Sequence, residues 1–135
     1  MSEEVIIKIV LSFYPDVEAI YVFGSYLTPD ERNESDVDIA LLFSHDQTKL
    51  LKNLGVSDCR YALEDALKKT VDLVNIRTAN TVFQHTIIQE GRIIYKKSEY
   101  SVDDFEMHVM SSYQKLNEER AEILEDILET GRIVQ

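Results

Sequence analysis

Cysteine, long apolar runs and positive charge are all scarce in this sequence, and each scarcity excludes a class of protein. Cys59 is the only cysteine, so the chain cannot form an internal disulfide or a metal site built from several cysteines, and we expect a cytoplasmic location. No apolar run reaches the roughly 18 residues of a membrane-spanning helix, and residues 1–4 lack the basic region of a signal peptide. The sequence therefore predicts a protein without a membrane segment.

Positive charge is scarce beside negative charge, because 14 Lys and Arg residues stand against 25 Asp and Glu residues, for a net charge of −11. Such a protein repels the phosphates of a long nucleic acid, whereas proteins that bind nucleic acid normally present a basic face. A basic protein partner would instead be attracted at long range. We therefore expect no direct binding of nucleic acid.

Apolar residues are plentiful: they make up 44% of the 135 residues, which suits a single domain with its own core. Apolar periodicity and turn residues predict helices over residues 5–14, 49–54, 59–69 and 81–90. Runs of β-branched and aromatic residues predict strands over residues 19–23, 37–43, 71–74 and 92–95. This alternation predicts an α/β fold in which a small mixed β-sheet is flanked by helices.

A longer helix is predicted over residues 102–130, where apolar side chains recur every three or four positions. These apolar positions are Phe105, Val109, Tyr113, Leu116, Ile123 and Ile127. Arg120 interrupts them, and acidic residues form another face of the helix. The pattern divides the chain into a domain over residues 1–100 and a C-terminal helical tail over residues 101–135. The apolar face of the tail either packs on the domain or binds a partner.

Two acidic residues, Asp38 and Asp72, lie where strands are otherwise apolar, and together with Asp36 they predict a metal site. Asp36 and Asp38 are two positions apart, so they project to one side of their strand while Val37 packs on the other. Two neighbouring carboxylates repel each other unless a cation holds them, and oxygen ligands of this kind suit Mg²⁺ or Mn²⁺. If the strand of Asp72 pairs beside them, a third carboxylate joins the site, as in two-metal phosphoryl transfer.

Gly24-Ser25 supplies a second element of the predicted site, at the end of the apolar run over residues 19–23. A glycine at this place lets the backbone approach a phosphate closely. Backbone N–H groups and the Ser25 hydroxyl then form a cradle for that phosphate. Either feature is common by itself, so the prediction depends on their combination with the aspartates.

The combination resembles the DNA polymerase β-like nucleotidyltransferase superfamily. A strand, Gly24-Ser25, ten intervening residues, the Asp36-Val37-Asp38 motif and then Asp72 on a third strand follow one another in the order typical of that superfamily. The chain is most similar to its minimal nucleotidyltransferase (MNT) branch, over residues 1–100. Pro29 departs from the pattern, because many relatives have glycine there, and proline fixes φ and removes a hydrogen-bond donor.

The resemblance implies an antitoxin of a HEPN/MNT toxin–antitoxin system. Such proteins transfer AMP from ATP to a tyrosine of the cognate HEPN ribonuclease toxin and thereby neutralise it. Asp36, Asp38 and Asp72 would then hold Mg²⁺ or Mn²⁺, and Asp72 would also deprotonate the tyrosine hydroxyl. Gly24 and Ser25 would bind the β- and γ-phosphates of ATP.

Several alternatives stay open from the sequence. An MNT-like antitoxin can also block its toxin by binding alone, and a small-molecule nucleotidyltransferase that modifies an aminoglycoside-like hydroxyl would share the same motif. Arg32 is the only cation between Ser25 and Asp36, which makes it a further candidate for phosphate binding. The three histidines lack the spacing of metal ligands, and we expect them to be structural or surface residues.

Overall fold

Four strands form one mixed sheet in the computed structural model, which describes residues 2–24, 36–51 and 53–130. The strands are β1 (Ala19–Phe23), β2 (Val37–Leu42), β3 (Val71–Asn75) and β4 (Arg92–Lys96). Their order across the sheet is β3-β2-β1-β4, with β1 antiparallel to both β2 and β4, and β2 parallel to β3. The predicted small mixed sheet is confirmed, and the strand of Asp72 does pair beside that of Asp38, the condition for a third carboxylate at the site.

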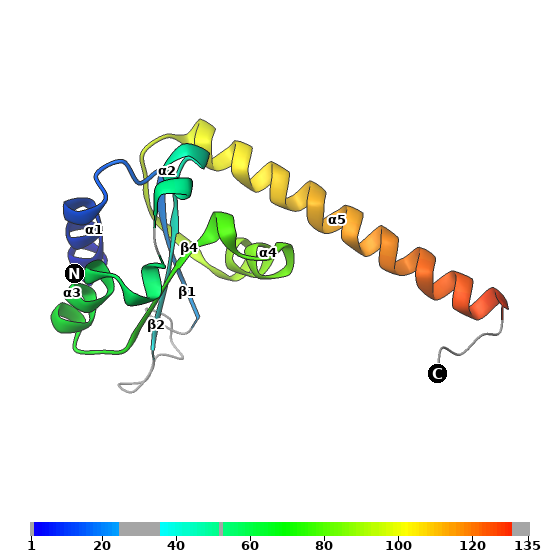
Figure 1. Cartoon of the computed structure of the whole chain (residues 1–135), viewed down its shortest axis with the longest axis horizontal. Helices are drawn as coiled ribbons and strands as arrows, with labels where there is room; N and C mark the ends of the chain where they lie inside the picture. Colours follow the sequence, from blue (N-terminus) through cyan, green and yellow to red (C-terminus); the bar gives the residue numbers. More distant parts are fainter. Residues whose placement is uncertain (1, 25–35, 52, 131–135) are drawn as a thin grey trace.

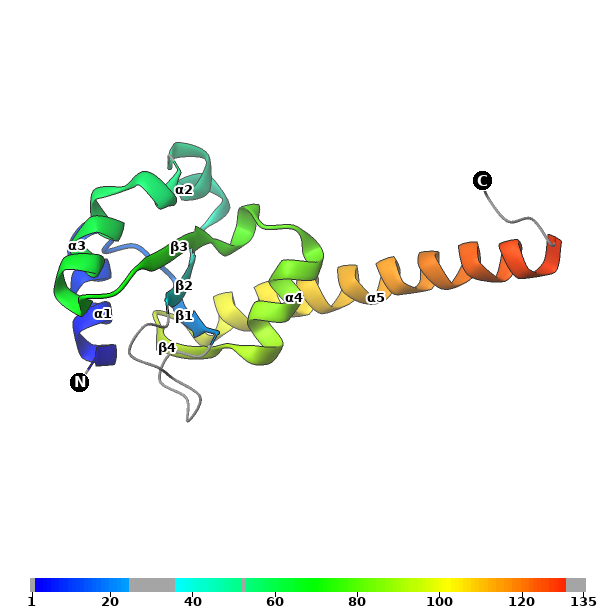
Figure 2. The same ribbon diagram turned by 90° about the horizontal axis from the view of Figure 1, so that it is seen from below.

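Helices cover both faces of this sheet (Figures 1 and 2). The helices are α1 (Ser2–Phe13), α2 (His45–Leu50), α3 (Asp58–Leu67), α4 (Thr81–Glu90) and α5 (Glu99–Thr130), with short 3-10 helices η1 (Leu54–Val56) and η2 (Ile76–Thr78). α1 and α3 lie on one face, and α4 and the first part of α5 lie on the other. No helix in the described part of the chain combines the length and hydropathy needed to cross a membrane.

Strand alternation explains why there are two cores. Successive side chains of a strand point to opposite faces of the sheet, and here both faces are buried. The core beneath α1 and α3 takes from the sheet Ile20, Val22, Val37, Ile39, Leu41, Val71 and Leu73. The core beneath α4 and α5 takes Ala19, Tyr21, Ala40 and Leu42. Val37 thus packs away from Asp38, as its position in the sequence predicts.

One predicted helix is misplaced. Residues 49–54 were expected to be helical, but the helix in this region is α2 (His45–Leu50). Ser44 determines its start, because its side-chain oxygen accepts a hydrogen bond from the backbone N–H of Gln47 at 3.1 Å and so caps the helix. Leu51 has an extended backbone and ends it. Ser57 caps α3 in the same way, through its side-chain oxygen.

Only the first part of α5 belongs to the packed body. Phe105 and Val109 are buried against the sheet, whereas Ile123 and Leu124 are each 60% exposed. Figure 1 shows the helix continuing as a single rod well beyond the other elements. Its 32 residues correspond to a length of about 48 Å. We call residues 116–130 the arm.

Candidate active site

Asp38 and Asp72 lie side by side at one end of the sheet. They are register partners in the parallel pairing of β2 with β3, so their side chains leave the same face of adjacent strands. Asp36 comes immediately before β2, exposed to solvent, and its charge acts on Asp38. The structure therefore brings together the three carboxylates that the sequence singled out.

The electrostatics of Asp38 are those of a carboxylate that lacks a counter-charge. Partial burial, then the charge of Asp72, then that of Asp36 raise its pKa to about 6. A side-chain hydrogen bond between Asp38 and Asp72 raises the pKa further, and such a bond requires a proton on one of the two. A positive charge at this point would counter every cause that raises the pKa of Asp38 except its burial.

Gly24 closes the site from β1. Phe23 is the register partner of Asp38, so Gly24 follows directly at the end of β1, next to the aspartates. Its φ of +77° lies in the left-handed region that side chains with a Cβ avoid. A Cβ here would overlap Oδ2 of Asp38. Both the backbone angle and the lack of a side chain are therefore required for the carboxylate to stand where it does.

The donor set fits a divalent metal ion. Three carboxylates offer hard oxygen ligands of the kind that Mg²⁺ prefers, and the charges of Asp72 and Asp36 that raise the pKa of Asp38 would be offset by a cation. Among the residues that the structure describes, no three carboxylate, imidazole or thiol groups already enclose an ion-sized space. The fit therefore concerns the type of ligand, and the described side chains do not form a ready-made three-ligand site.

An ion-pair clamp on α3 holds the start of β3 at the edge of the sheet. Arg60 of α3 donates from Nε to the backbone oxygen of Val71 at 2.8 Å, and Oε2 of Glu64 accepts from the backbone N–H of Val71 at 2.9 Å. The two side chains pair with each other at 3.3 Å. The i, i+4 spacing of Arg60 and Glu64 predicts the pair, but only the fold shows that it fixes the residue before Asp72.

An aromatic pair lies beside the aspartates. The rings of Phe23 on β1 and Phe83 on α4 meet edge to face with 5.7 Å between centroids. Because Phe23 is the register partner of Asp38, this pair borders the candidate site on the face covered by α4. The apolar runs of the sequence predict neither the contact nor its place, since the two residues are far apart in the chain.

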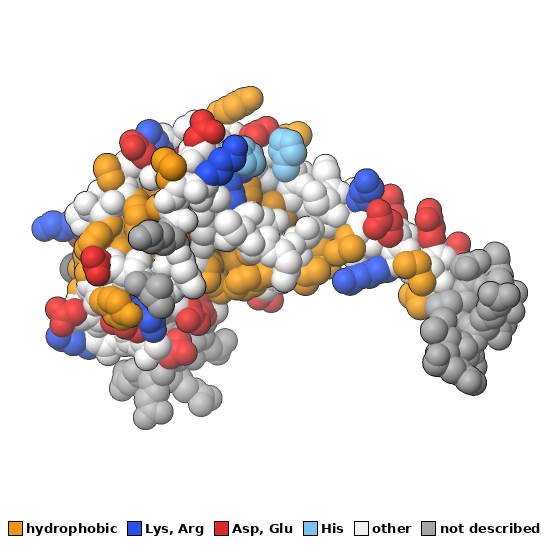
Figure 3. Space-filling model, in the orientation of Figure 1, with side chains coloured by type: hydrophobic (Ala, Val, Ile, Leu, Met, Phe, Trp, Pro, Cys, Tyr) orange, Lys and Arg blue, Asp and Glu red, His pale blue; other side chains and the backbone are white. Residues whose placement is uncertain are grey.

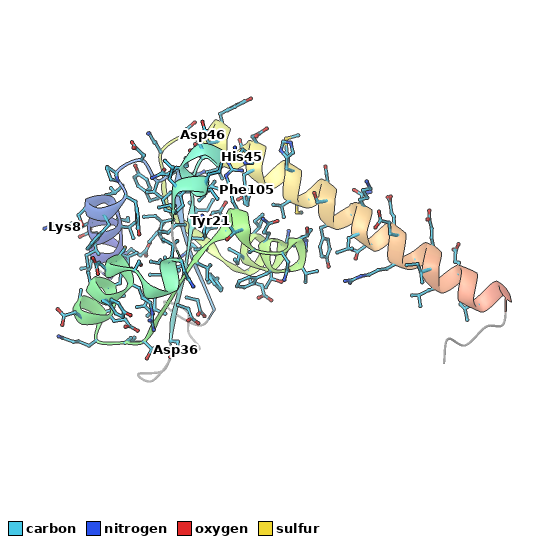
Figure 4. The ribbon with its side chains drawn as sticks, in the orientation of Figure 1. Lys8, Tyr21, Asp36, His45, Asp46 and Phe105 are labelled. Atoms are coloured by element: carbon cyan, nitrogen blue, oxygen red, sulfur yellow. The ribbon has the colours of Figure 1, made fainter. Side chains whose placement is uncertain are left out.

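The histidines lie apart from the carboxylates, as expected. Figure 4 shows His45 and Asp36 at opposite ends of the sheet. His45 contacts Arg77 at 3.2 Å, and His108 contacts a backbone oxygen of the preceding turn at 2.7 Å. His85 stacks on Tyr113 with 3.6 Å between ring centroids and so joins α4 to α5. Each histidine thus has a contact outside the candidate site, and its structural or surface role stays a prediction.

Three positions named from the sequence lie outside the described residues. They are Ser25, Pro29 and Arg32, all within residues 25–35. The predicted phosphate contacts of Ser25 and Arg32 therefore stay predictions, and so does the effect of Pro29 on the loop.

The comparison with protein families agrees with this geometry. The family model described as "Polymerase beta, Nucleotidyltransferase" matches residues 5–100, a range that contains Gly24 and all three aspartates. This chain belongs to the polymerase β-type nucleotidyltransferase family. It is also similar to the protein adenylyltransferase MntA of Shewanella oneidensis, with 32% identity over 95% of this chain and 88% of that protein.

Solved structures show the same similarity in three dimensions. A chain of a toxin–antitoxin complex with AMP-PNP superposes with a TM-score of 0.79 and 31% identity, covering 95% of this chain and 99% of that one. A chain from the complex of tri-AMPylated Shewanella oneidensis HEPN toxin with MNT antitoxin gives 0.73 and 31%, covering 94% and 96%. These matches extend over nearly the whole chain, α5 included, and confirm the nucleotidyltransferase fold.

Proposed function

We propose that this chain is the antitoxin of a HEPN/MNT toxin–antitoxin system and acts as a protein adenylyltransferase. It transfers AMP from ATP to a tyrosine of its cognate HEPN toxin and thereby neutralises the toxin. A cytoplasmic location belongs to the same proposal, because the single, buried Cys59 suits a reducing compartment.

The observation that carries the proposal is the register of Asp38 with Asp72 beside Gly24. Three carboxylates placed together at the end of a sheet destabilise the fold, as the raised pKa of Asp38 shows. A protein that acts by binding alone has no use for this arrangement. Relatives that match nearly the full chain carry the names of an adenylyltransferase and of a complex between a HEPN toxin and an MNT antitoxin.

The reaction forms a bond between the tyrosine oxygen and the α-phosphorus of ATP and breaks the bond to pyrophosphate. Asp72, exposed at the edge strand, accepts the proton of the tyrosine hydroxyl. Gly24, which has no side chain, leaves room for the Asp38 carboxylate at the end of β1, where the triphosphate would bind. In this proposal Ser25 and Arg32 hold the phosphates from the loop.

Asp36, Asp38 and Asp72 would hold Mg²⁺, which when bound would offset the negative charge that develops on the phosphates during transfer. Asp38 would hold it from β2, Asp36 from the position just before β2, and Asp72 from β3. Catalysis by these residues is therefore mainly the positioning of reactants and the holding of charge.

The proposal is tested by mixing the chain with ATP, Mg²⁺ and the HEPN-domain protein encoded beside it, then weighing that protein by mass spectrometry. We expect mass to be added in steps of one AMP, and chelation of Mg²⁺ to stop the addition. A HEPN protein that is bound and inhibited but keeps its mass would show that the chain acts by binding alone.

Two variants serve as controls for the chemistry. Asp36→Asn and Asp38→Asn keep the size of each side chain and remove its charge, so both should slow transfer by at least about 10²-fold while the complex still forms. Undiminished transfer in either variant would place the metal site elsewhere.

A further inference from the structure

We propose that the groove between α4 and α5, together with the apolar face of the arm that continues it, is the docking surface for the protein that supplies the acceptor tyrosine. This inference rests on the proposed function, since it names the surface by which the HEPN partner is held at the active site.

The groove lies where the start of α4 meets the middle of α5. Val82, Phe83 and Thr86 line it from α4, and Leu116 and Arg120 line it from α5, around a volume of about 610 Å³. Val82 is 41% exposed although it is apolar. The groove is therefore an accessible, largely apolar surface with one cation at its edge.

The groove is connected to the active site through Phe83. The ring of Phe83 lines the groove and also packs edge to face on Phe23. Phe23 is in turn the register partner of Asp38. Only the Phe83 and Phe23 rings therefore separate a protein segment in the groove from the carboxylates. The groove lies on the same face of the sheet as Asp38.

The arm extends the same surface outward. At 100° per residue, Leu116, Ile123 and Leu124 all lie within about 60° of Arg120 on the helix. Ile123 and Leu124 are each 60% exposed, so this face packs against the groove at Leu116 and against nothing described beyond it. Figure 3 shows hydrophobic side chains along the lower edge of the arm.

The acidic residues of the arm lie on the other side of the helix. Glu118, Glu119, Glu122 and Glu125 are all at least about 100° away from Arg120, and Figure 3 shows acidic side chains on the upper edge of the arm. The arm is therefore amphipathic, with an apolar face on the groove side. Burial of such a face normally supplies most of the stability of a helix, and here that burial needs another protein.

Arg120 indicates which protein fits. It makes no ion pair within the described part of the chain, and no acidic residue occupies the positions three or four away from it. A second copy of this chain would bring another Arg120 onto the same apolar face, where the two charges would repel. The surface instead fits a partner that offers apolar side chains around a carboxylate.

The test compares variants of this face with a matched control. Arg120→Glu reverses the central charge, and an Ile123→Glu, Leu124→Glu double variant removes the apolar contact at exposed positions that the fold does not need. Lys115→Glu makes the same charge change as Arg120→Glu, about 140° away on the acidic side of the helix. Each purified full chain is titrated with the neighbouring HEPN-domain protein, and AMP addition to that protein is followed in parallel.

We expect both face variants to weaken binding of the HEPN protein by about 10- to 100-fold and to slow AMP addition in proportion, with ATP binding unchanged. Lys115→Glu should stay within about twofold. Unchanged binding in the face variants would overturn the proposal, and so would a wild-type chain that forms dimers which these variants dissociate. Binding that depends on this face without any AMP addition would keep the docking surface and overturn only the proposed function.

Discussion

The two halves of α5 carry apolar residues at the same helical spacing, yet only the first half is buried. Val102, Phe105 and Val109 are at most 5% exposed, whereas Ile123 and Leu124 in the arm are each 60% exposed. The first half packs on the face of the sheet that α4 also covers, whereas the arm lies beyond the edge of the sheet. Periodicity thus identifies which side of a helix is apolar, but only the length of the neighbouring elements decides what covers it.

The largest effect should come from the buried half. Phe105→Ala removes a side chain that packs in the core beneath α4 and α5 and lies under the Arg77 guanidinium, 5.3 Å from the ring centroid. We expect a loss of about 3–4 kcal/mol in the free energy of unfolding, measured by urea denaturation. A loss below about 1 kcal/mol would mean that the first half of α5 is not part of the core.

A smaller loss should follow at Gly24, where the packed body meets the active site. Gly24→Ala places a Cβ against the Asp38 carboxylate and forces alanine to adopt a φ of +77°. We expect a loss of about 2–3 kcal/mol in the free energy of unfolding, together with slower AMP transfer. Gly55→Ala is the control, because Gly55 does not have a left-handed φ; equal losses at the two glycines would contradict the close approach at Asp38.

Asp38 should make stability depend on pH. Its pKa of about 6 in the folded chain exceeds the ordinary 3.8, so the folded state binds the proton more tightly and loses stability as pH rises from about 4 to about 6. Because solvent partly screens this group, Asp38→Asn should gain only about 1 kcal/mol at pH 7 without metal.

The pH experiment is urea denaturation of wild type and Asp38→Asn between pH 4 and 8 in the presence of a chelator. The difference between the two should shrink steadily toward pH 4, where Asp38 is protonated in the folded chain and partly protonated in the unfolded chain, whose pKa is 3.8. Adding Mg²⁺ at pH 7 should stabilise the wild type and leave the variant almost unchanged. A pH-independent difference would show that Asp38 does not carry the raised pKa.

The smallest effect should come from the arm. Leu124→Ser changes a side chain that is 60% exposed, so the free energy of unfolding should stay within about 0.5 kcal/mol of the wild type. The same denaturation series that includes Phe105→Ala provides the comparison. A loss of more than about 1 kcal/mol in the isolated chain would mean that the arm already packs on something.

Much of the fold could be predicted from local patterns. The four strands were evident from their apolar runs, and the acids within β2 and β3 were conspicuous because strands buried on both faces are otherwise apolar. α2 was misplaced because one capping side chain, Ser44, decides the start of a six-residue helix that has little apolar periodicity of its own.

The site was predictable where it depends on strand period and chain order. Asp36, Asp38, Asp72 and Gly24 follow from those two rules. The Phe23–Phe83 pair and the hold of Arg60 on Val71 were not predictable, because each joins residues from different elements whose packing no local pattern records.

The clamp at Val71 has a second consequence, for how the protein behaves at high concentration. β3 is the outermost strand of the sheet, and Val71 turns its N–H and C=O away from β2. Both groups are already taken, one by Glu64 and the other by Arg60. A foreign strand that tried to extend the sheet would find no partners at this residue, and edges blocked in this way resist aggregation. The side chains that hold the residue before Asp72 in place therefore also oppose the addition of a foreign strand to the sheet.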